Sequence, residues 1–201
     1  MIKTTSMILD ELKDYVNPTA KLSRMVRLGN YTQIVRGLYE TDPSTPGYLL
    51  AGSIYGPSYL SFDFALDYYN LIPEAVYVFT SATFDKKKKK TYETSFGKFV
   101  YRDIPKEVYP FEVELAKEGE YYFQIASPEK AICDKLYSLS PVKNMKEMYT
   151  LLTDYLRIEH ESLEAFQYEK IETIYRKYHS ANVDLFAKVL RRMRGIHEQY
   201  D

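Results

Sequence analysis

Apolar residues recur at helical spacing from the start of the chain. Within residues 7–16 one stripe has charged residues outside it, which predicts an amphipathic helix that buries Ile8, Leu9, Leu12, Tyr15 and Val16. Asn17 and Pro18 have the residue types of an N-cap followed by proline at the first helical position. The second helix would bury Leu22, and Gly29 is placed to end it in the left-handed conformation. Two short helices are therefore expected first.

Beyond Gly29 the pattern changes to that of strands. Residues 31–35 are rich in strand-favouring side chains, Gly37 permits a tight turn, and residues 38–39 begin a return strand. The second predicted helix is basic, and a basic helix followed by a hairpin is the arrangement with which a winged helix binds DNA. We therefore predict a minimal winged helix-turn-helix at the N-terminus, made of two helices and one hairpin.

Residues 42–47, with the sequence DPSTPG, are the clearest boundary in the chain. Two prolines and a glycine continue neither a helix nor a sheet ladder. The boundary divides the chain into a winged-helix domain at 1–46 and a second domain at 47–201. Because about forty residues bury little core, the small domain should pack against the second one. Within the second domain we expect an α/β core at 47–140 and a helical tail at 141–201.

Helix and strand patterns are mixed in the second domain. The expected helices of its core lie at 48–55, from a Ser61 cap to Asn70, and from a Ser127 cap through Pro128 to Leu139, and the expected strands lie at 75–83, 91–93, 98–102 and 121–126. The run at 75–83 begins apolar on both faces, which is typical of a central strand. The tail predicts helices at 146–156, at 162–178 with a break near Gln167, and at 182–194. The fold class is therefore α+β, ending in a helical bundle.

Composition limits the functions that the chain can have. It has 201 residues and a net charge of −1, so contact with nucleic acid must come from a local patch. Cys133 is the single cysteine, which excludes an internal disulfide and fits a reducing compartment. No run of about 18 apolar residues could span a bilayer. Asp10 and Glu11 interrupt any signal-peptide core, so we expect a cytoplasmic protein that does not bind membrane.

The local basic patch lies in residues 18–39, which contain four cations and no acid. Lys21, Arg24 and Arg27 recur at three-residue intervals along one side of the second helix, and Arg36 lies in the turn of the hairpin. These cations either face water or bind DNA. The lysine run at 86–90 has the same two interpretations, and there we favour a solvated loop that protects an edge strand.

The residues that carry catalysis in other proteins are sparse here. No pair of His160, His179 and His197 has metal-ligand spacing, and no phosphate-binding or nucleophile motif is present. Cys133 is interpreted as a core residue. We therefore predict that the chain is no enzyme and has neither a cofactor nor a metal site. The enzyme alternative is a Mg²⁺-dependent nuclease that uses residues from the pool Asp63, Glu74, Asp103, Glu129, Lys130 and Asp134.

Four blocks of sequence together indicate a family. The first, NPTAKLSRMVRLGNYTQIVRGLYE, resembles the N-terminal winged-helix segment of the AbiEi antitoxins. The second, GYLLAGSIYGPSYLSFDFALDYYNLIPEAVYVFTSAT, is similar to the core of their C-terminal domain, as are TSFGKFVYRDIP and QIASPEKAICDKLY. The blocks come in the family's order and cover about residues 5–140.

The resemblance implies an antitoxin of a type IV toxin–antitoxin system, used in abortive infection by phage. The toxin of such a system is a nucleotidyltransferase, encoded next door and opposed without a stable complex. The resemblance also implies a transcriptional repressor that binds inverted repeats in its own promoter DNA. It is compatible with a monomer in solution that pairs on DNA. The family's contact residues carry over to Lys21, Ser23, Arg24, Arg27 and Arg36.

One departure from the family concerns the helices. Many relatives have three helices before the hairpin, and this chain has room for two. Such a trimmed domain would bind DNA weakly or borrow a helix from the residues after Gly47. Two further alternatives stay open: a DNA-binding regulator of this fold without a toxin, and an interaction module that uses a tyrosine-rich surface, since the chain has 21 tyrosines.

Overall fold

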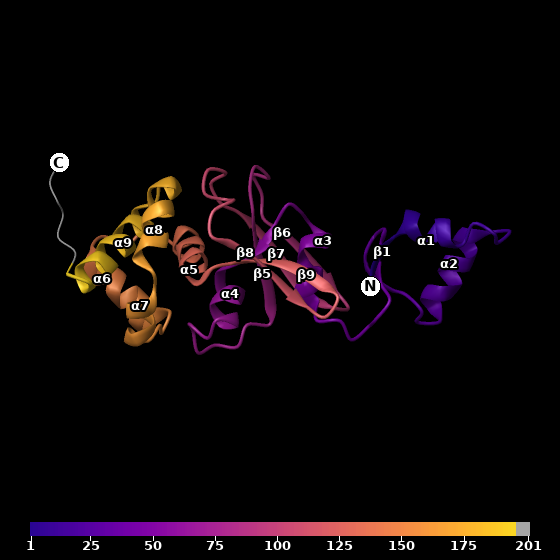
Figure 1. Ribbon diagram of the computed structural model, residues 1–201, viewed down its shortest axis with the longest axis horizontal. Helices are drawn as coiled ribbons and strands as arrows, with labels where there is room; N and C mark the ends of the chain where they lie inside the picture. The colour runs from indigo at the N-terminus through magenta and orange to yellow at the C-terminus, as the bar shows by residue number, and fades with distance from the viewer. Residues whose placement is uncertain (196–201) are drawn as a thin grey trace.

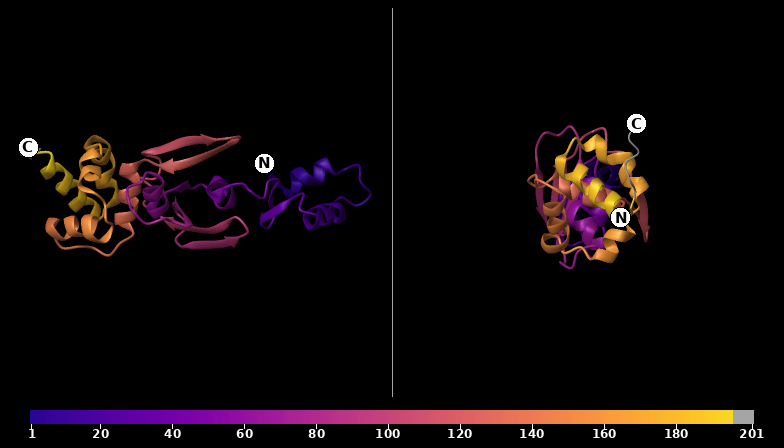
Figure 2. Two further views of the ribbon diagram at one scale, coloured as in Figure 1. Left: turned by 90° about the horizontal axis from the view of Figure 1, so that it is seen from below. Right: turned by 90° about the vertical axis from the view of Figure 1, so that its left-hand side faces the viewer.

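A computed structural model describes residues 1–195 and shows an elongated molecule. A small N-terminal unit lies at one end, a six-stranded sheet lies in the middle, and the C-terminal helices form the other end (Figure 1). Two hairpins, β6 with β7 and β8 with β9, extend from the large sheet toward the N-terminal unit (Figure 2). The fold is therefore a mixed α+β arrangement with two separate sheets.

The N-terminal unit has two helices and a three-stranded antiparallel sheet, ordered β1-β3-β2. Its elements are β1 (Ile2–Thr4), α1 (Thr5–Glu11), α2 (Pro18–Arg27), β2 (Thr32–Val35) and β3 (Leu38–Glu40). The two helices and the hairpin were predicted, whereas β1 was not. The predicted end of the first helix was wrong, because α1 ends at Glu11 and leaves Tyr15 and Val16 exposed.

Local capping explains where α2 begins and ends. Asn17 Oδ1 accepts a hydrogen bond from the backbone N–H of Ala20 at 3.0 Å, and Pro18 occupies the first turn. Gly29 lies just beyond the helix with a φ of 77°, a left-handed conformation that suits a residue without Cβ. Both predicted helix signals are thereby confirmed.

The N-terminal unit has only a small core of its own. Ile8, Leu12, Leu22 and Tyr31 form a separate buried cluster. Ile34 belongs instead to the large core of the rest of the chain, together with the half-buried Ile2, Val35 and Leu38. The unit therefore packs against the remainder of the protein, as its size predicts. The proposed division at residues 46 and 47 stays a prediction.

The second sheet has the strand order β6-β7-β5-β4-β9-β8. Its strands are β4 (Tyr59–Leu60), β5 (Val78–Thr83), β6 (Lys90–Thr94), β7 (Gly97–Asp103), β8 (Val113–Glu118) and β9 (Tyr121–Ala126). β5 is parallel to β7, with Val78 opposite Lys98, and β4 is parallel to β9. The other neighbours are antiparallel.

The interior position predicted for the strand at 75–83 is confirmed, but its start is not. β5 begins at Val78, because the backbone N–H of Val76 donates to Asp67 Oδ2 at 2.8 Å rather than to a neighbouring strand. The edge strand β8 was not predicted.

Short helices cover the large sheet. They are η1 (Gly47–Leu50), α3 (Ala51–Ile54), α4 (Phe62–Tyr68) and α5 (Pro128–Tyr137). The Ser127 hydroxyl caps α5 by accepting from the backbone N–H of Lys130 at 3.3 Å, as predicted. Ser61 does stand before α4, but its hydroxyl donates to Asp134 at 2.7 Å instead of capping the helix. α4 ends before the predicted Asn70, which has a positive φ of 56°.

The C-terminal part is helical, as predicted. Its elements are α6 (Met145–Thr150), a π-helical turn η2 (Leu151–Tyr155), α7 (His160–Ala165), α8 (Tyr168–Ile174), η3 (Tyr175–Tyr178) and α9 (Ala181–Met193). The predicted break near Gln167 separates α7 from α8. Residues 196–201, which include His197 and the end of the predicted domain at 47–201, lie outside the described residues.

One hydrophobic core joins the large sheet to these helices. It contains buried residues of the strands, such as Phe99 and Ile125, and of the helices, such as Ile171 and Phe186. Cys133 is fully buried within it, as predicted. The α/β core and the helical tail therefore share one interior. None of the helices within residues 1–195 combines the length and the apolar character that crossing a bilayer requires.

Candidate nucleic-acid interface

The candidate interface is the outer face of α2. Leu22 is buried on the inner face, with a 5% exposed surface, and Met25 and Val26 are half-buried beside it. At 3.6 residues per turn, Arg24 and Arg27 fall on the opposite side of the helix, and both are exposed. The hydrophobic pattern that fixes the helix on its core thus also directs two guanidinium groups outward.

The polar side chains of α2 differ in how they are held. Arg24 and Arg27 make no side-chain hydrogen bond or ion pair with any residue that the structure describes. The Lys21 ammonium lies 4.5 Å from the centre of the Tyr15 ring, and the Ser23 hydroxyl donates to the Thr19 carbonyl at 3.1 Å. The two arginines are therefore available to an anionic partner, and Lys21 is held beside them by a cation–π contact.

Tyr15 is a residue that sequence reasoning assigned wrongly. It was placed on the buried stripe of the first helix, but it is exposed in the connection to α2. Its ring serves as the platform for Lys21 instead. Helical spacing offered no signal for this contact, because α1 ends before Tyr15.

Arg36 is positioned apart from α2. It lies with Gly37 in the two-residue turn between β2 and β3, and Gly37 has a φ of 86°. The Gly37 carbonyl accepts a hydrogen bond from the backbone N–H of Thr5 at 2.9 Å, which holds the turn against the start of α1. Arg36 is exposed, and its side chain makes no hydrogen bond or ion pair with any residue that the structure describes. The structure therefore gathers four of the five predicted contact residues on one helix and presents the fifth in the turn of the β2–β3 hairpin.

Two acids of the N-terminal unit are already engaged elsewhere. Glu11 pairs with Lys3 at 2.7 Å, and this hydrogen bond raises the pKa of Lys3. Glu40 is buried and accepts hydrogen bonds from the backbone N–H groups of Thr41 and Asp42, at 2.8 and 3.1 Å. Neither carboxylate pairs with the cations of α2, so the outer face of that helix keeps its positive charge.

The lysine run at 86–90 has a different setting. It connects β5 to the edge strand β6, which begins at Lys90. Lys86 lies 5.3 Å from the centre of the Tyr55 ring, and the backbone N–H of Lys87 donates to Asp103 at 2.5 Å. The favoured interpretation, a loop beside an edge strand, agrees with this position.

The residues of the nuclease alternative do not converge. Within residues 1–195 no three His, Cys, Asp or Glu side chains lie where they could hold a metal ion together. Asp63 pairs with Lys135 at 2.6 Å, Glu74 pairs with Arg157, and Asp103 accepts from Thr83 at 2.6 Å. Glu129 accepts from the backbone N–H of Gln167 at 2.8 Å, at the break between α7 and α8. Asp63 and Glu74 lie near one another, but each carboxylate already has its own partner within the protein.

Asp134 and Lys130 form a buried network instead of a metal site. Asp134 accepts hydrogen bonds from Tyr59, Ser61 and Tyr178 at 2.9, 2.7 and 2.6 Å. Lys130 lies 3.7 Å from the Asp134 carboxylate and donates to the Val108 carbonyl at 2.8 Å.

The buried environment of this network shifts the pKa values of its lysine and tyrosine side chains. Burial lowers the pKa of Lys130, and the nearby Asp134 carboxylate opposes that shift. Burial and the Asp134 charge both raise the pKa values of Tyr59 and Tyr178. The network joins the sheet to the C-terminal helices. Because every side chain of this set is closed to solvent, it offers no access to a substrate.

Comparison with known proteins gave no family model and no curated protein with a significant match to this chain. The resemblance to the AbiEi antitoxins therefore depends on the four sequence blocks alone.

Proposed function

We propose that the N-terminal unit is a DNA-binding winged helix with α2 as its recognition helix. The observation that carries the proposal is the pair of exposed guanidinium groups on α2, Arg24 and Arg27, which have no protein partner among the described residues. Arginine in such a position can bind phosphates or the acceptor atoms of guanine in the major groove.

The connectivity of the unit supports this proposal. Two helices lie between β1 and β2, and β3 returns between these strands to give the order β1-β3-β2. This is the strand order of a winged helix, with two helices between its first and second strands. α2 has 10 residues and is therefore about 15 Å long, which suits a helix lying in the major groove.

The short wing limits what Arg36 can do. With only Arg36 and Gly37 between the paired residues Val35 and Leu38, the turn cannot extend far into a groove. Arg36 therefore binds a phosphate beside the major groove rather than a base, and α2 supplies the contacts within the groove, including phosphate contacts by Arg24 and Arg27.

For the whole chain we propose an antitoxin of the AbiEi type that also represses its own operon. The four sequence blocks support this proposal, and the last of them opens α5, the helix that carries Lys130 and Asp134. In this proposal the second domain opposes a nucleotidyltransferase toxin without a stable complex. The N-terminal unit carries the protein to inverted repeats in the promoter.

A gel-shift experiment with DNA from upstream of the coding region tests the DNA-binding part. The variant with Arg24→Gln and Arg27→Gln should bind at least about tenfold more weakly. The matched control replaces Lys88 and Lys89 with Gln, because it removes the same charge from another exposed basic segment. Equal binding by wild type and the arginine variant would exclude α2 as the recognition helix.

A rescue experiment with the neighbouring toxin gene tests the antitoxin part separately. Cells that express the nucleotidyltransferase should recover growth with the wild-type protein and also with the variant at Arg24 and Arg27. A regulator without a toxin would bind the promoter in the same way but would rescue nothing.

A further inference from the structure

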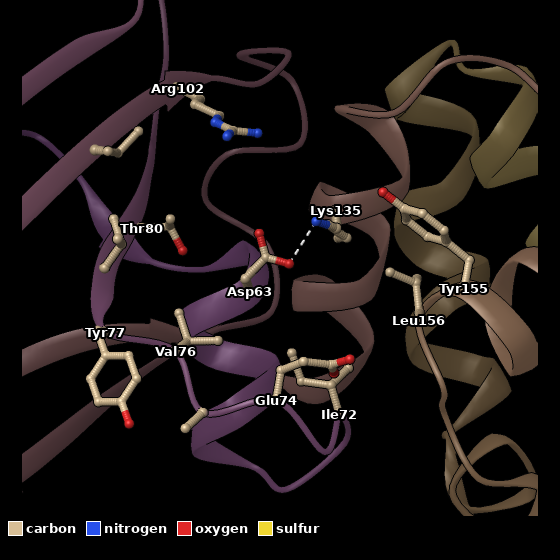
Figure 3. A pocket seen from close by; sticks show the side chains of 13 residues that line it. Asp63, Ile72, Glu74, Val76, Tyr77, Thr80, Arg102, Lys135, Tyr155 and Leu156 are labelled. Atoms are coloured by element: carbon tan, nitrogen blue, oxygen red, sulfur yellow. Dashed lines mark ion pairs between the residues drawn. The ribbon is translucent and has the colours of Figure 1, made fainter.

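A cavity of about 510 Å³ lies between the large sheet and the C-terminal helices, away from α2. Figure 3 shows Thr80 and Arg102 on the sheet side, Lys135 on α5, and Tyr155 and Leu156 on the far side. Apolar side chains form most of its wall, namely Ile72, Val76, Val78, Val100 and Leu156. This volume and this lining are typical of sites that bind small molecules.

Arg102 is the unusual group in this cavity. Its guanidinium lies 5.7 Å from the centre of the Phe62 ring, and its Nε is buried without a hydrogen-bond partner. It makes no ion pair with any acid in the part of the chain that the structure describes. The terminal nitrogens of the guanidinium also lack a partner among the described residues and, unlike Nε, are open to solvent, so an acceptor from outside the chain can reach them.

The other charges at the cavity are already paired. Lys135 Nζ lies 2.6 Å from the Asp63 carboxylate, and Glu74 pairs with Arg157 at the rim. Figure 3 shows the Lys135–Asp63 pair facing the same space as the Arg102 guanidinium. Neither carboxylate therefore neutralises Arg102, which leaves one positive charge uncompensated beside an apolar wall.

We propose that this cavity binds a small molecule with one anionic group and a compact apolar body. The anionic group is a carboxylate or a phosphate ester, which matches the fork of donors on Arg102. The apolar body lies against the valine and leucine side chains of the wall. This proposal is independent of DNA binding, because none of its residues belongs to the N-terminal unit.

Calorimetric titration of the full chain tests the proposal with four probes: phenyl phosphate, benzoate, benzyl alcohol and inorganic phosphate. Phenyl phosphate or benzoate should bind at least about tenfold more tightly than benzyl alcohol, which lacks the charge, and inorganic phosphate, which lacks the ring. The tighter of the two charged probes identifies the anionic group. Absence of binding by both, or equal binding of benzyl alcohol, would overturn the proposal.

Two variants locate the binding. Arg102→Met keeps an apolar stem over Phe62 but removes the guanidinium, so the better probe should lose at least about tenfold in affinity. Lys98→Met is the matched control, because Lys98 lies on the same strand, is paired with Glu93 at 3.0 Å and does not line the cavity. Unchanged affinity in the Arg102 variant would contradict the assignment.

A measurement on the wild-type protein covers the case in which Arg102→Met fails to fold. The Nε–H resonance of Arg102 should shift during titration with the better probe, since the anionic group binds the same guanidinium and Nε has no other partner within the described residues. A titration that shows binding while this resonance stays unchanged would place the ligand elsewhere and overturn the proposal.

Discussion

Two helices of this molecule begin alike and use their positive charges in opposite ways. α2 and α5 each have 10 residues, a polar cap that accepts a hydrogen bond, and a proline in the first turn. On α2, Arg24 and Arg27 are exposed and unpaired within the described residues. On α5, Lys130 is completely buried beside Asp134 and the Val108 carbonyl.

The difference shows what decides the role of a cation. A buried charge needs partners inside the protein, because removing it from water costs several kcal/mol. Lys130 has such partners, and its network holds the sheet and the C-terminal helices together. Exposed arginines on α2 keep their water and can exchange it for the phosphates of a ligand. Both helices begin with a cap and a proline, so the different roles of their cations come from the residues that pack over each helix.

The largest expected effect comes from removing the shared acceptor of the buried network. Asp134→Ala leaves the Lys130 charge and the hydroxyls of Tyr59, Ser61 and Tyr178 without their carboxylate. The free energy of unfolding should fall by about 3–5 kcal/mol, measured by denaturant unfolding. Asp14→Ala, at an exposed acid, should change it by less than about 0.5 kcal/mol. A loss of under about 1 kcal/mol for Asp134→Ala would show that the network is not structural.

Replacing both charged partners sharpens the same comparison. A Lys130→Met, Asp134→Leu variant buries no unpaired charge, although the tyrosine hydroxyls still lose an acceptor. Its free energy of unfolding should therefore lie above that of Asp134→Ala by about 1–3 kcal/mol. A double-mutant cycle of the wild type, Lys130→Met, Asp134→Leu and the double variant, measured by denaturant unfolding, gives the coupling energy between the two side chains. Additive losses would mean that Lys130 and Asp134 act independently.

The two helix caps should differ by a smaller amount. Ser127→Ala removes a buried cap of α5, whereas Asn17→Ala removes an exposed cap of α2. We expect losses of about 1–2 kcal/mol for Ser127→Ala and about 0.5–1 kcal/mol for Asn17→Ala, measured by thermal unfolding. The reverse order would indicate that α2, and not α5, is the helix on which the fold depends.

The smallest effect on stability is expected on the outer face of α2. Arg24→Gln with Arg27→Gln removes no contact within the described residues, so the free energy of unfolding should change by less than about 0.5 kcal/mol. A larger loss, measured by the same denaturant titration, would mean that these arginines stabilise the fold.

The sequence is sufficient to locate features that depend on neighbouring residues. Asn17 with Pro18 and Ser127 with Pro128 marked the starts of α2 and α5, because a cap and a proline act within one turn. The break near Gln167 was local as well. The exposure of Arg24 and Arg27 could be inferred from their spacing relative to Leu22.

Features that depend on distant partners could not be predicted. β8, with the sequence VELAKE, consists largely of helix-favouring residues and is a strand because β9 pairs with it. The network around Asp134 needs Tyr59 and Tyr178, which lie on different elements. The position of Arg102 at the cavity could not be predicted either, because a cation within a strand pattern does not show which cavity it will face.

The most direct test of the central claim, that α2 meets DNA through its unpaired arginines, is the salt dependence of promoter binding. The logarithm of the binding constant is plotted against the logarithm of the salt concentration for wild type and for the Arg24→Gln, Arg27→Gln variant. Loss of two phosphate contacts should reduce the steepness of the slope by about 1.8, while the control at Lys88 and Lys89 keeps the wild-type slope. Equal slopes for wild type and the arginine variant would contradict the claim.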